Sequence, residues 1–307
     1  MRRIVLLSDI VRFLGDGVIA LDGDINDKSI DCIAMFGEST SSSLDWVNTS
    51  REDKQHLVES SKSLALLVDE SVEYSIMMQK QEKVLIRVSN PRVSIGMIGN
   101  QFFVVRPKPG IHRSAVIKED VQIHPTASIG ANSVLGKCII GKGSVIHNNV
   151  TINDGVLVGD NVEVFSGSVL GTNGLGCFRD YHGELQMFPH LGRLLIENDV
   201  VIGANCSIAR GSLSDTIIGR GTKINALCFI AHNCIIGKNV FITGSSMLNG
   251  SVRVGDDTII YSQVIVRDQA VIGSESIIGM GSVVTKDIPS NEVWVGNPAR
   301  FLRKNEK

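Results

Sequence analysis

The sequence is poor in aromatic residues, carries almost equal numbers of both charges and has no long apolar run. Phe, Trp and Tyr make up 5% of its 307 residues, and 30 Lys and Arg residues stand against 32 Asp and Glu residues. A formal net charge of −2 gives the whole chain no electrostatic attraction for nucleic acid or for an acidic membrane surface. Because no stretch reaches 18 apolar residues, we expect no membrane-spanning helix.

Closely spaced cysteine pairs are also lacking. The six cysteines are scattered, no CxxC occurs, and the closest two are Cys228 and Cys234. The N-terminal stretch MRRIVLLSDIVRFLG combines arginines with apolar residues, but Asp9 and Arg12 interrupt it and no small-residue cleavage site follows. We therefore expect buried, reduced thiols and a cytoplasmic protein.

Glycine is abundant, at 31 residues, and an aliphatic residue recurs at every sixth position. Between residues 218 and 284 this period runs without a slip. Its members are Ile218, Ile224, Ile230, Ile236, Ile242, Leu248, Val254, Ile260, Val266, Ile272, Ile278 and Val284. A run with the same period and one slip covers residues 111–170, and a short third phase covers residues 196–208. Gly often follows the aliphatic residue, which permits a tight corner there.

A six-residue period predicts a parallel β-helix, in which each hexad contributes one short strand and one turn. Three hexads close a coil of 18 residues, so segments 111–170 and 196–284 supply roughly eight coils. The repeated aliphatic side chains point inward, and stacked coils lie about 4.8 Å apart. Residues 171–193 abandon the period and hold two of the seven histidines, which favours a functional loop.

The predicted fold class is mainly β, with a parallel β-helix behind a smaller domain. Residues 1–105 lack the hexad and mix helix-like with strand-like patterns, which predicts a small α/β domain. The segment RPKPG that follows has the composition of a hinge. We place the solenoid at residues 106–287, with the excursion at 171–193, and a C-terminal basic tail at residues 288–307.

Histidine spacing argues against a metal site and singles out one candidate base. His112, His124 and His147 are 12 and 23 residues apart, so they do not stack on one corner of an 18-residue coil, and we expect no bound metal. His232 should face outward near a corner, and Gly250 occupies the same corner one coil further along. His232 is either an ordinary polar corner residue or a base beside a backbone N–H that stabilises an oxyanion.

Parts of the chain resemble known hexapeptide acyltransferases. The excursion GTNGLGCFRDYHGELQMFPHLGR and the later motifs IARGSLSDT and IAHN resemble the UDP-3-O-(3-hydroxyacyl)glucosamine N-acyltransferases of lipid A synthesis. SDIVRFLG, SLDWVN and SLALLVDE resemble the uridine-nucleotide-binding domain of the same family. The C-terminal stretch IIGMGSVVTKDIPSNEVWVGNPARFLRK instead resembles hexapeptide acetyltransferases that use coenzyme A.

The resemblance implies a left-handed coil and a homotrimer with active sites between neighbouring solenoids. It implies that His232 is the general base and that the Gly250 N–H holds the tetrahedral oxyanion. Two positions depart from the family. The acid that supports its catalytic histidine falls on Asn225 here, and its second histidine, which serves the acceptor or the acyl donor, falls on Gln269.

The resemblance also implies where substrates bind. Trp46 and Asn48 fall where the family holds the nucleotide, and Trp46 either stacks on uracil or thymine or is a core aromatic. We also expect His190, in the excursion, to contact substrate. Four basic residues near the C-terminus either meet the phosphates of coenzyme A or form a solvated terminus. These four are Lys286, Arg300, Arg303 and Lys304.

We therefore predict an N-acyltransferase that moves an acyl group from a short acyl-coenzyme A to a nucleotide-linked amino sugar, for an O-antigen, capsule or similar glycan. One alternative is the lipid A N-acyltransferase with a 3-hydroxyacyl carrier protein as donor. Another is a catalytically silent solenoid that binds a nucleotide sugar. The sequence leaves open the choice between UDP and dTDP, the sugar, the acyl length, and O-acylation in place of N-acylation.

Overall fold

The computed structural model describes residues 3–306, and the chain divides into two compact units between Arg106 and Pro107. The first unit is the predicted small α/β domain, with a five-stranded sheet in the order β2-β7-β6-β5-β4. β2 runs antiparallel to β7, and the other pairs are parallel. The strands are β2 (Val18–Asp22), β4 (Cys32–Ile33), β5 (Ser43–Trp46), β6 (Ala65–Val68) and β7 (Val84–Val88), and a separate pair joins β1 (Val5–Leu6) to β3 (Ser29–Ile30).

Helices cover both faces of this sheet. They are α1 (Leu7–Leu14), α2 (Lys54–Ser60), α3 (Ile76–Lys80) and α4 (Pro91–Ile98), with the short helices η1 (Gly15–Gly17) and η2 (Gly99–Phe103). Alternate residues of β6 pack in two different clusters, Ala65 and Leu67 with α1 and α4, and Leu66 and Val68 with α2 and α3. Since both faces of the strand are buried, β6 is apolar at every position.

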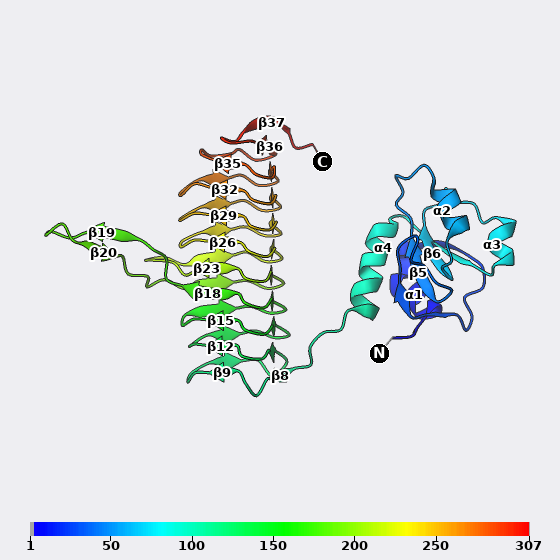
Figure 1. The fold of residues 1–307 in the computed structure, drawn as a ribbon, viewed down its shortest axis with the longest axis horizontal. Helices are drawn as coiled ribbons and strands as arrows, with labels where there is room; N and C mark the ends of the chain where they lie inside the picture. The colour runs from blue at the N-terminus through cyan, green and yellow to red at the C-terminus, as the bar shows by residue number, and fades with distance from the viewer. Residues whose placement is uncertain (1–2, 307) are drawn as a thin grey trace. The chain divides into compact units, whose positions relative to one another are not determined.

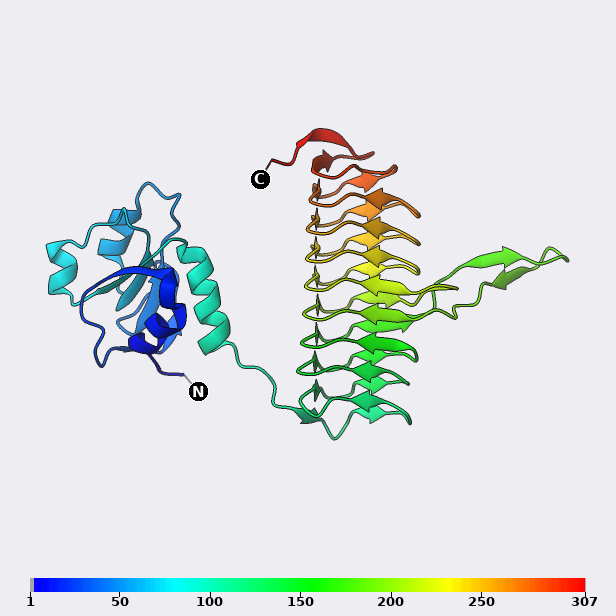
Figure 2. The same cartoon turned by 180° about the vertical axis from the view of Figure 1, so that it is seen from behind.

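The second unit is a stack of coils whose strands form three parallel sheets (Figures 1 and 2). Sheet 1 contains β8 (Gly110–Ile111), β11 (Ser128–Ile129), β14 (Val145–Ile146), β17 (Glu163–Val164), β22 (Val201–Ile202), β25 (Lys223–Ile224), β28 (Phe241–Ile242), β31 (Ile259–Ile260), β34 (Ile277–Ile278), β36 (Glu292–Val295) and β37 (Arg300–Lys304). Sheet 2 contains β9 (Val116–Ile117), β12 (Val134–Leu135), β15 (Thr151–Ile152), β18 (Val169–Thr172), β23 (Ser207–Ala209), β26 (Phe229–Ile230), β29 (Met247–Leu248), β32 (Ile265–Val266) and β35 (Val283–Val284). Sheet 3 contains β10 (Gln122–Ile123), β13 (Ile139–Ile140), β16 (Val156–Val158), β21 (Leu194–Ile196), β24 (Thr216–Ile218), β27 (Ile235–Ile236), β30 (Arg253–Val254) and β33 (Val271–Ile272).

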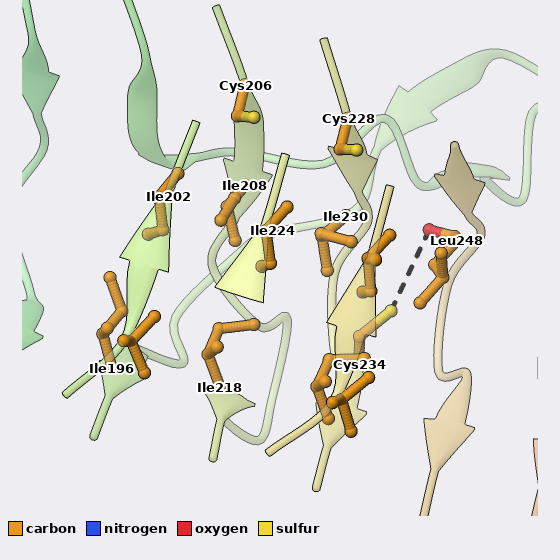
Figure 3. Packing of buried hydrophobic residues seen from close by; sticks show 14 of the residues in the cluster. Ile196, Ile202, Cys206, Ile208, Ile218, Ile224, Cys228, Ile230, Cys234 and Leu248 are labelled. Atoms are coloured by element: carbon orange, nitrogen blue, oxygen red, sulfur yellow. Dashed lines mark hydrogen bonds between the residues drawn. The ribbon is translucent and has the colours of Figure 1, made fainter. Parts of the chain in front are cut away.

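Between residues 217 and 284 the paired residues of neighbouring coils are 18 positions apart, as the hexads predict. Ile224 pairs with Ile242 and Ile230 with Leu248, and all four side chains are buried. Figure 3 shows Ile208, Ile230 and Leu248 in one such column inside the coil, with Cys206 and Cys228 at equivalent places in successive coils. Each further coil adds one residue to every column and so extends the apolar core, and each repeat is stabilised by its neighbours.

The excursion at 171–193 contains a two-stranded antiparallel hairpin of β19 (Cys177–Arg179) and β20 (Leu185–Met187). The hairpin projects away from the stack of coils (Figures 1 and 2), and every residue of its two strands is exposed. The expectation of buried thiols is therefore wrong for Cys177, which lies on β19. Cys138, Cys206, Cys228 and Cys234 are buried.

The described part of the expected basic tail, residues 288–306, belongs to the end of the solenoid. β36 pairs in parallel with β34, and β37 folds back antiparallel onto β36. Trp294 of β36 is buried and packs on the last apolar residues of the coil, while β37 is exposed along its length. A solenoid needs a polar cover over its terminal coil, and these two strands supply it.

Candidate active site

His232 lies at the corner where the chain turns from β26 to β27. Because β26 pairs with β29, Gly250 takes the same corner one coil further along. A Cβ atom on Gly250 would lie 2.9 Å from Cε1 and 3.0 Å from Nε2 of the His232 ring, so a side chain there would displace the imidazole. Within residues 3–306 the Gly250 N–H donates to no acceptor. The corner therefore places an imidazole edge beside an unpaired backbone donor. An imidazole can act as a general base, and a backbone N–H can hold an oxyanion.

Asn233 fixes the tautomer of the His232 ring. Its Nδ2 donates to the carbonyl oxygen of Ser214 (2.9 Å), which identifies the other amide atom as oxygen. This Oδ1 accepts from the N–H and the hydroxyl of Ser212 (3.1 and 2.7 Å) and lies 2.9 Å from His232 Nδ1. In a neutral ring Nδ1 must therefore carry the proton, and Nε2 presents a lone pair, as a general base requires.

Asn225 and His232 lie at different corners of this chain. Asn225 follows β25, at the corner between sheets 1 and 2, whereas His232 lies between sheets 2 and 3. The Oδ1 atom of Asn225 accepts from the N–H of Ala226 (2.7 Å). The residue that orients the imidazole is Asn233, its neighbour in the sequence, and the motif IAHN contained the signal that could have identified it.

The end of the excursion returns to this corner and brings His190 against His232. The two ring centroids are 5.3 Å apart with the rings nearly perpendicular. His190 is 8% exposed, its Nδ1 lies 2.9 Å from the carbonyl oxygen of Phe188, and its Nε2 is buried with no partner among residues 3–306. Burial lowers the pKa of His190, the hydrogen bond to Phe188 opposes this only in part, and His232 and Arg210 add to the lowering. His190 is thus a neutral imidazole beside the candidate base.

A polar groove of about 410 Å³ lies along the same edge of the solenoid. Its lining residues are Lys118, Asn153, Asp154, Gly171, Thr172, Asn173 and Arg210. Arg210 takes the corner one coil before His232, because β23 pairs with β26. Its guanidinium donates to the carbonyl oxygens of Gly192 (2.6 Å) and Asp154 (3.2 Å), which hold it in place. The groove therefore brings positive charge next to the His232 corner.

The first unit has a pocket of about 280 Å³ that contains both residues predicted to hold a nucleotide, Trp46 and Asn48. Met35, Phe36, Asp45, Val47 and Arg51 complete its lining. Trp46 is half-buried: it packs partly on the core and also lines this pocket. Asn48 Oδ1 accepts from the N–H and hydroxyl of Ser50 (3.2 and 3.1 Å).

Asp45 is the residue of this pocket that the sequence did not reveal. Its side chain is fully buried, Oδ1 accepts from the N–H of Trp46 (2.8 Å), and Oδ2 has no partner among residues 3–306. Burial raises the pKa of this carboxyl to about 6, and the bond from Trp46 offsets the rise only in part. A buried carboxyl without full solvation or pairing costs stability when it ionises.

We expect Asp45→Asn to stabilise the first unit at high pH only. The folded-state pKa of Asp45 lies above the ordinary value of 3.8 for this carboxyl, so ionisation destabilises the fold as pH rises from about 4 through about 6. At pH 8 the variant should gain on the order of 2 kcal/mol in unfolding free energy. At pH 4 the two proteins should be equally stable. Urea denaturation followed by Trp46 fluorescence in a Trp294→Phe background measures this, and equal stability at both pH values would contradict it.

The sequence matches the family model described as Bacterial transferase hexapeptide (six repeats) at residues 215–250 and 251–286. It is 31% identical to the UDP-3-O-acylglucosamine N-acyltransferase of Coxiella burnetii over 69% of this chain and 66% of that protein, so it spans just under two thirds of that relative's length. With the enzyme of the same name from Pseudomonas syringae pv. tomato, the identity is again 31%, over 75% of this chain and 68% of the relative. The chain belongs to this family of UDP-3-O-acylglucosamine N-acyltransferases.

A solved structure with a similar solenoid is the UDP-N-acetylglucosamine O-acyltransferase (LpxA) of Moraxella catarrhalis. It is 26% identical, with a TM-score of 0.58, and the match covers 64% of this chain and 75% of that one. A six-residue period does not fix the hand of the coil, and the left hand remains what the family resemblance implies.

The remaining predicted site residues lie on the C-terminal coils. Gln269 follows β32, its N–H donates to the carbonyl oxygen of Gly250 (2.8 Å), and its side-chain amide lies 3.4 Å from Asp268. It therefore lies one coil beyond Gly250 on the edge that carries His232.

The structure does not gather the four basic residues into one cluster. Lys286 follows β35 and places Nζ 5.2 Å from the centre of the Trp294 ring, whereas the other three lie on β37. Lys304 forms an ion pair with Glu292 at 2.7 Å. Arg300 and Arg303 are exposed, and each donates to a backbone carbonyl oxygen next to it.

Among residues 3–306, no group of three or more His, Cys, Asp or Glu side chains has the arrangement of a metal site. No described helix has both the length and the apolar character that crossing a bilayer demands.

Proposed function

We propose that this chain is an N-acyltransferase that moves an acyl group from a thioester to the amine of a nucleotide-linked amino sugar, with His232 as general base. Membership of the UDP-3-O-acylglucosamine N-acyltransferase family supports the reaction class. The single observation that carries the role of His232 is its geometry, a lone pair on Nε2, set by Asn233, beside the unpaired N–H of Gly250.

In the proposed reaction the amine nitrogen attacks the thioester carbonyl carbon. Nε2 of His232 takes a proton from this nitrogen, and Asn233 Oδ1 stabilises the imidazolium through Nδ1–H. The tetrahedral oxyanion is held by the Gly250 N–H. Collapse breaks the C–S bond, and the thiolate receives the proton from His232, which leaves an amide and a free thiol. No cysteine takes part.

The nucleotide of the acceptor binds in the pocket of the first unit, with the base against Trp46 and with Asn48 and Arg51 at its polar end. UDP is the nucleotide in the names of the relatives, and dTDP has the same ring N–H and carbonyl pattern.

We propose acyl-coenzyme A as donor, with an acyl carrier protein as the alternative. Arg300 and Arg303 are the cations that best suit the phosphates, because Lys304 is paired with Glu292 and Lys286 lies over Trp294. Gln269 lies further along the same edge and is placed to meet the pantetheine arm or the acceptor.

We further propose a cytoplasmic homotrimer with active sites between neighbouring solenoids. Its support is the apolar character of the outer faces, where Phe241, Met247 and Ile265 are 42%, 40% and 42% exposed. Light scattering should give three times the chain mass of 33.2 kDa, and a stable monomer at micromolar concentration would contradict the trimer.

A thiol-release assay tests the function. Acetyl-coenzyme A, 3-hydroxybutyryl-coenzyme A and a 3-hydroxyacyl carrier protein are each offered with a panel of UDP- and dTDP-linked amino sugars. Turnover with a coenzyme A thioester supports the proposal as stated. Turnover only with the carrier protein would assign the lipid A reaction. Binding of nucleotide sugars without any turnover would favour a silent binding protein.

A further inference from the structure

The Nε2 atom of His190 is buried and has no donor among residues 3–306. An unsatisfied buried polar atom costs free energy, so the site is incomplete without a group that donates to it. His190 Nδ1 lies within hydrogen-bonding distance of the carbonyl oxygen of Phe188, and a carbonyl oxygen can only accept. Nδ1 must therefore carry the ring proton, and Nε2 presents a lone pair.

His232 has the same tautomer for a similar reason. Its Nδ1 faces Asn233 Oδ1, which also accepts, so Nε2 is the unprotonated nitrogen. In their neutral forms the two rings, with centroids 5.3 Å apart, each leave Nε2 as the acceptor, and His190 Nε2 has no partner among residues 3–306. Such a pair offers two acceptors to one ligand.

Gly174, near the start of the excursion, lies against both rings. A Cβ atom there would lie 2.6 Å from His190 Nε2 and 2.7 Å from His232 Cδ2, which is bonded to Nε2 in the ring. The Nε2 edges of the two rings therefore border the same space. Only the glycine backbone at position 174 lies between them and a ligand, so contact between His190 Nε2 and a ligand at His232 requires that this backbone move aside.

We propose that His190 and His232 form a paired acceptor for the two hydrogens of a primary amine, and that His190 thereby selects an amine over a hydroxyl acceptor. This inference rests on the proposed acyl transfer. A primary amine carries two N–H groups, one for each Nε2, and keeps its lone pair for the thioester carbonyl. A hydroxyl carries a single O–H and leaves His190 unsatisfied.

The proton balance of the reaction is unchanged. His232 removes one hydrogen as the N–C bond forms and returns it to the thiolate as the C–S bond breaks. The second hydrogen stays on nitrogen, held by His190 Nε2, and becomes the N–H of the amide. His190 therefore contacts the reacting atom without changing its own protonation state.

Two substitutions distinguish the effect of the His190 lone pair from the effect of the size of its ring. His190→Phe keeps a ring against His232 and removes the acceptor, whereas His190→Gln keeps an oxygen acceptor. The acceptors compared are the nucleotide-linked amino sugar that turns over best and the same nucleotide sugar with a hydroxyl in place of the amine. We expect His190→Phe to lower kcat/KM for the amine about ten- to a hundredfold and to leave any rate with the hydroxyl sugar unchanged. His190→Gln should retain most of the amine rate.

An equal loss with both acceptors, or no loss with either, would overturn the proposal and leave the acyl transfer standing. A second measurement does not depend on turnover. Long-range ¹⁵N–¹H NMR of histidine-labelled protein, assigned with His190→Gln and His232→Gln, should show both rings neutral with the proton on Nδ1. A proton on His190 Nε2 overturns the paired acceptor, even if the wild type acylates nothing in the panel and the proposed function itself fails.

Discussion

We expect His232→Gln to lower kcat/KM for acyl transfer by about a thousandfold and to leave the fold unchanged. A positioned general base contributes about 10²- to 10⁴-fold, and glutamine cannot take a proton from the attacking amine. The side chain points out of the coil at a corner, so the substitution removes no core contact. The thiol-release assay measures the rate, and thermal unfolding checks that the fold persists.

His124→Gln is the matched control for this change. His124 also lies at a corner of the solenoid, where its Nδ1 is 2.9 Å from the hydroxyl of Thr126. It has the exposure of a surface residue and no glycine packed on its ring. Its substitution should leave kcat/KM within about twofold. Similar losses in the two variants, or full activity in His232→Gln, would remove His232 from the reaction.

Gly250→Ala should lower kcat/KM by about a hundredfold or more, although the change adds one methyl group to the surface. The new Cβ atom meets the His232 ring at 2.9 and 3.0 Å, so the imidazole must move from its place beside Asn233 and the Gly250 N–H. Misplacing a catalytic group by about 1 Å costs about a hundredfold in rate. Nucleotide-sugar binding, measured by calorimetry, should change little, because the pocket around Trp46 lies in the other unit.

Gly244→Ala controls for the loss of glycine itself. Gly244 lies in the same run of coils, and a Cβ atom there would meet only the carbonyl oxygen of Ala226, at 3.3 Å. This variant should keep nearly full activity. Equal effects of the two substitutions would point to a general distortion of the solenoid and not to the contact between Gly250 and His232.

The solenoid could be predicted because each of its coils repeats the same physical requirement. One inward aliphatic residue in each hexad fixes the register, and the 18-residue coil stacks Gly250 on His232 without any further information. The end of the solenoid was less predictable. Its last coil loses the hexad period, since β36 and β37 are longer strands that cover the core with Trp294.

The partners within the site could not be predicted from the period. The partner of His232 is Asn233. The backbone of Asn233 is left-handed, with φ of 60°, and this turns the Asn233 side-chain amide back toward the His232 ring. The position of His190 depends on how a 23-residue excursion closes, which no repeat specifies. Asp45 gave no signal either, because strand β5 is short and its alternation does not distinguish a buried carboxyl from an exposed one.

The most direct test of direct transfer from thioester to amine is the intact mass of the protein during turnover, recorded together with the mass of the product. With the best donor and acceptor of the panel, the account predicts a nucleotide-linked amide, one free thiol for each amide formed, and an unmodified protein mass throughout. An acylated protein that forms and decays at the rate of turnover would contradict it, because a covalent intermediate needs a nucleophile on the chain and a different task for His232.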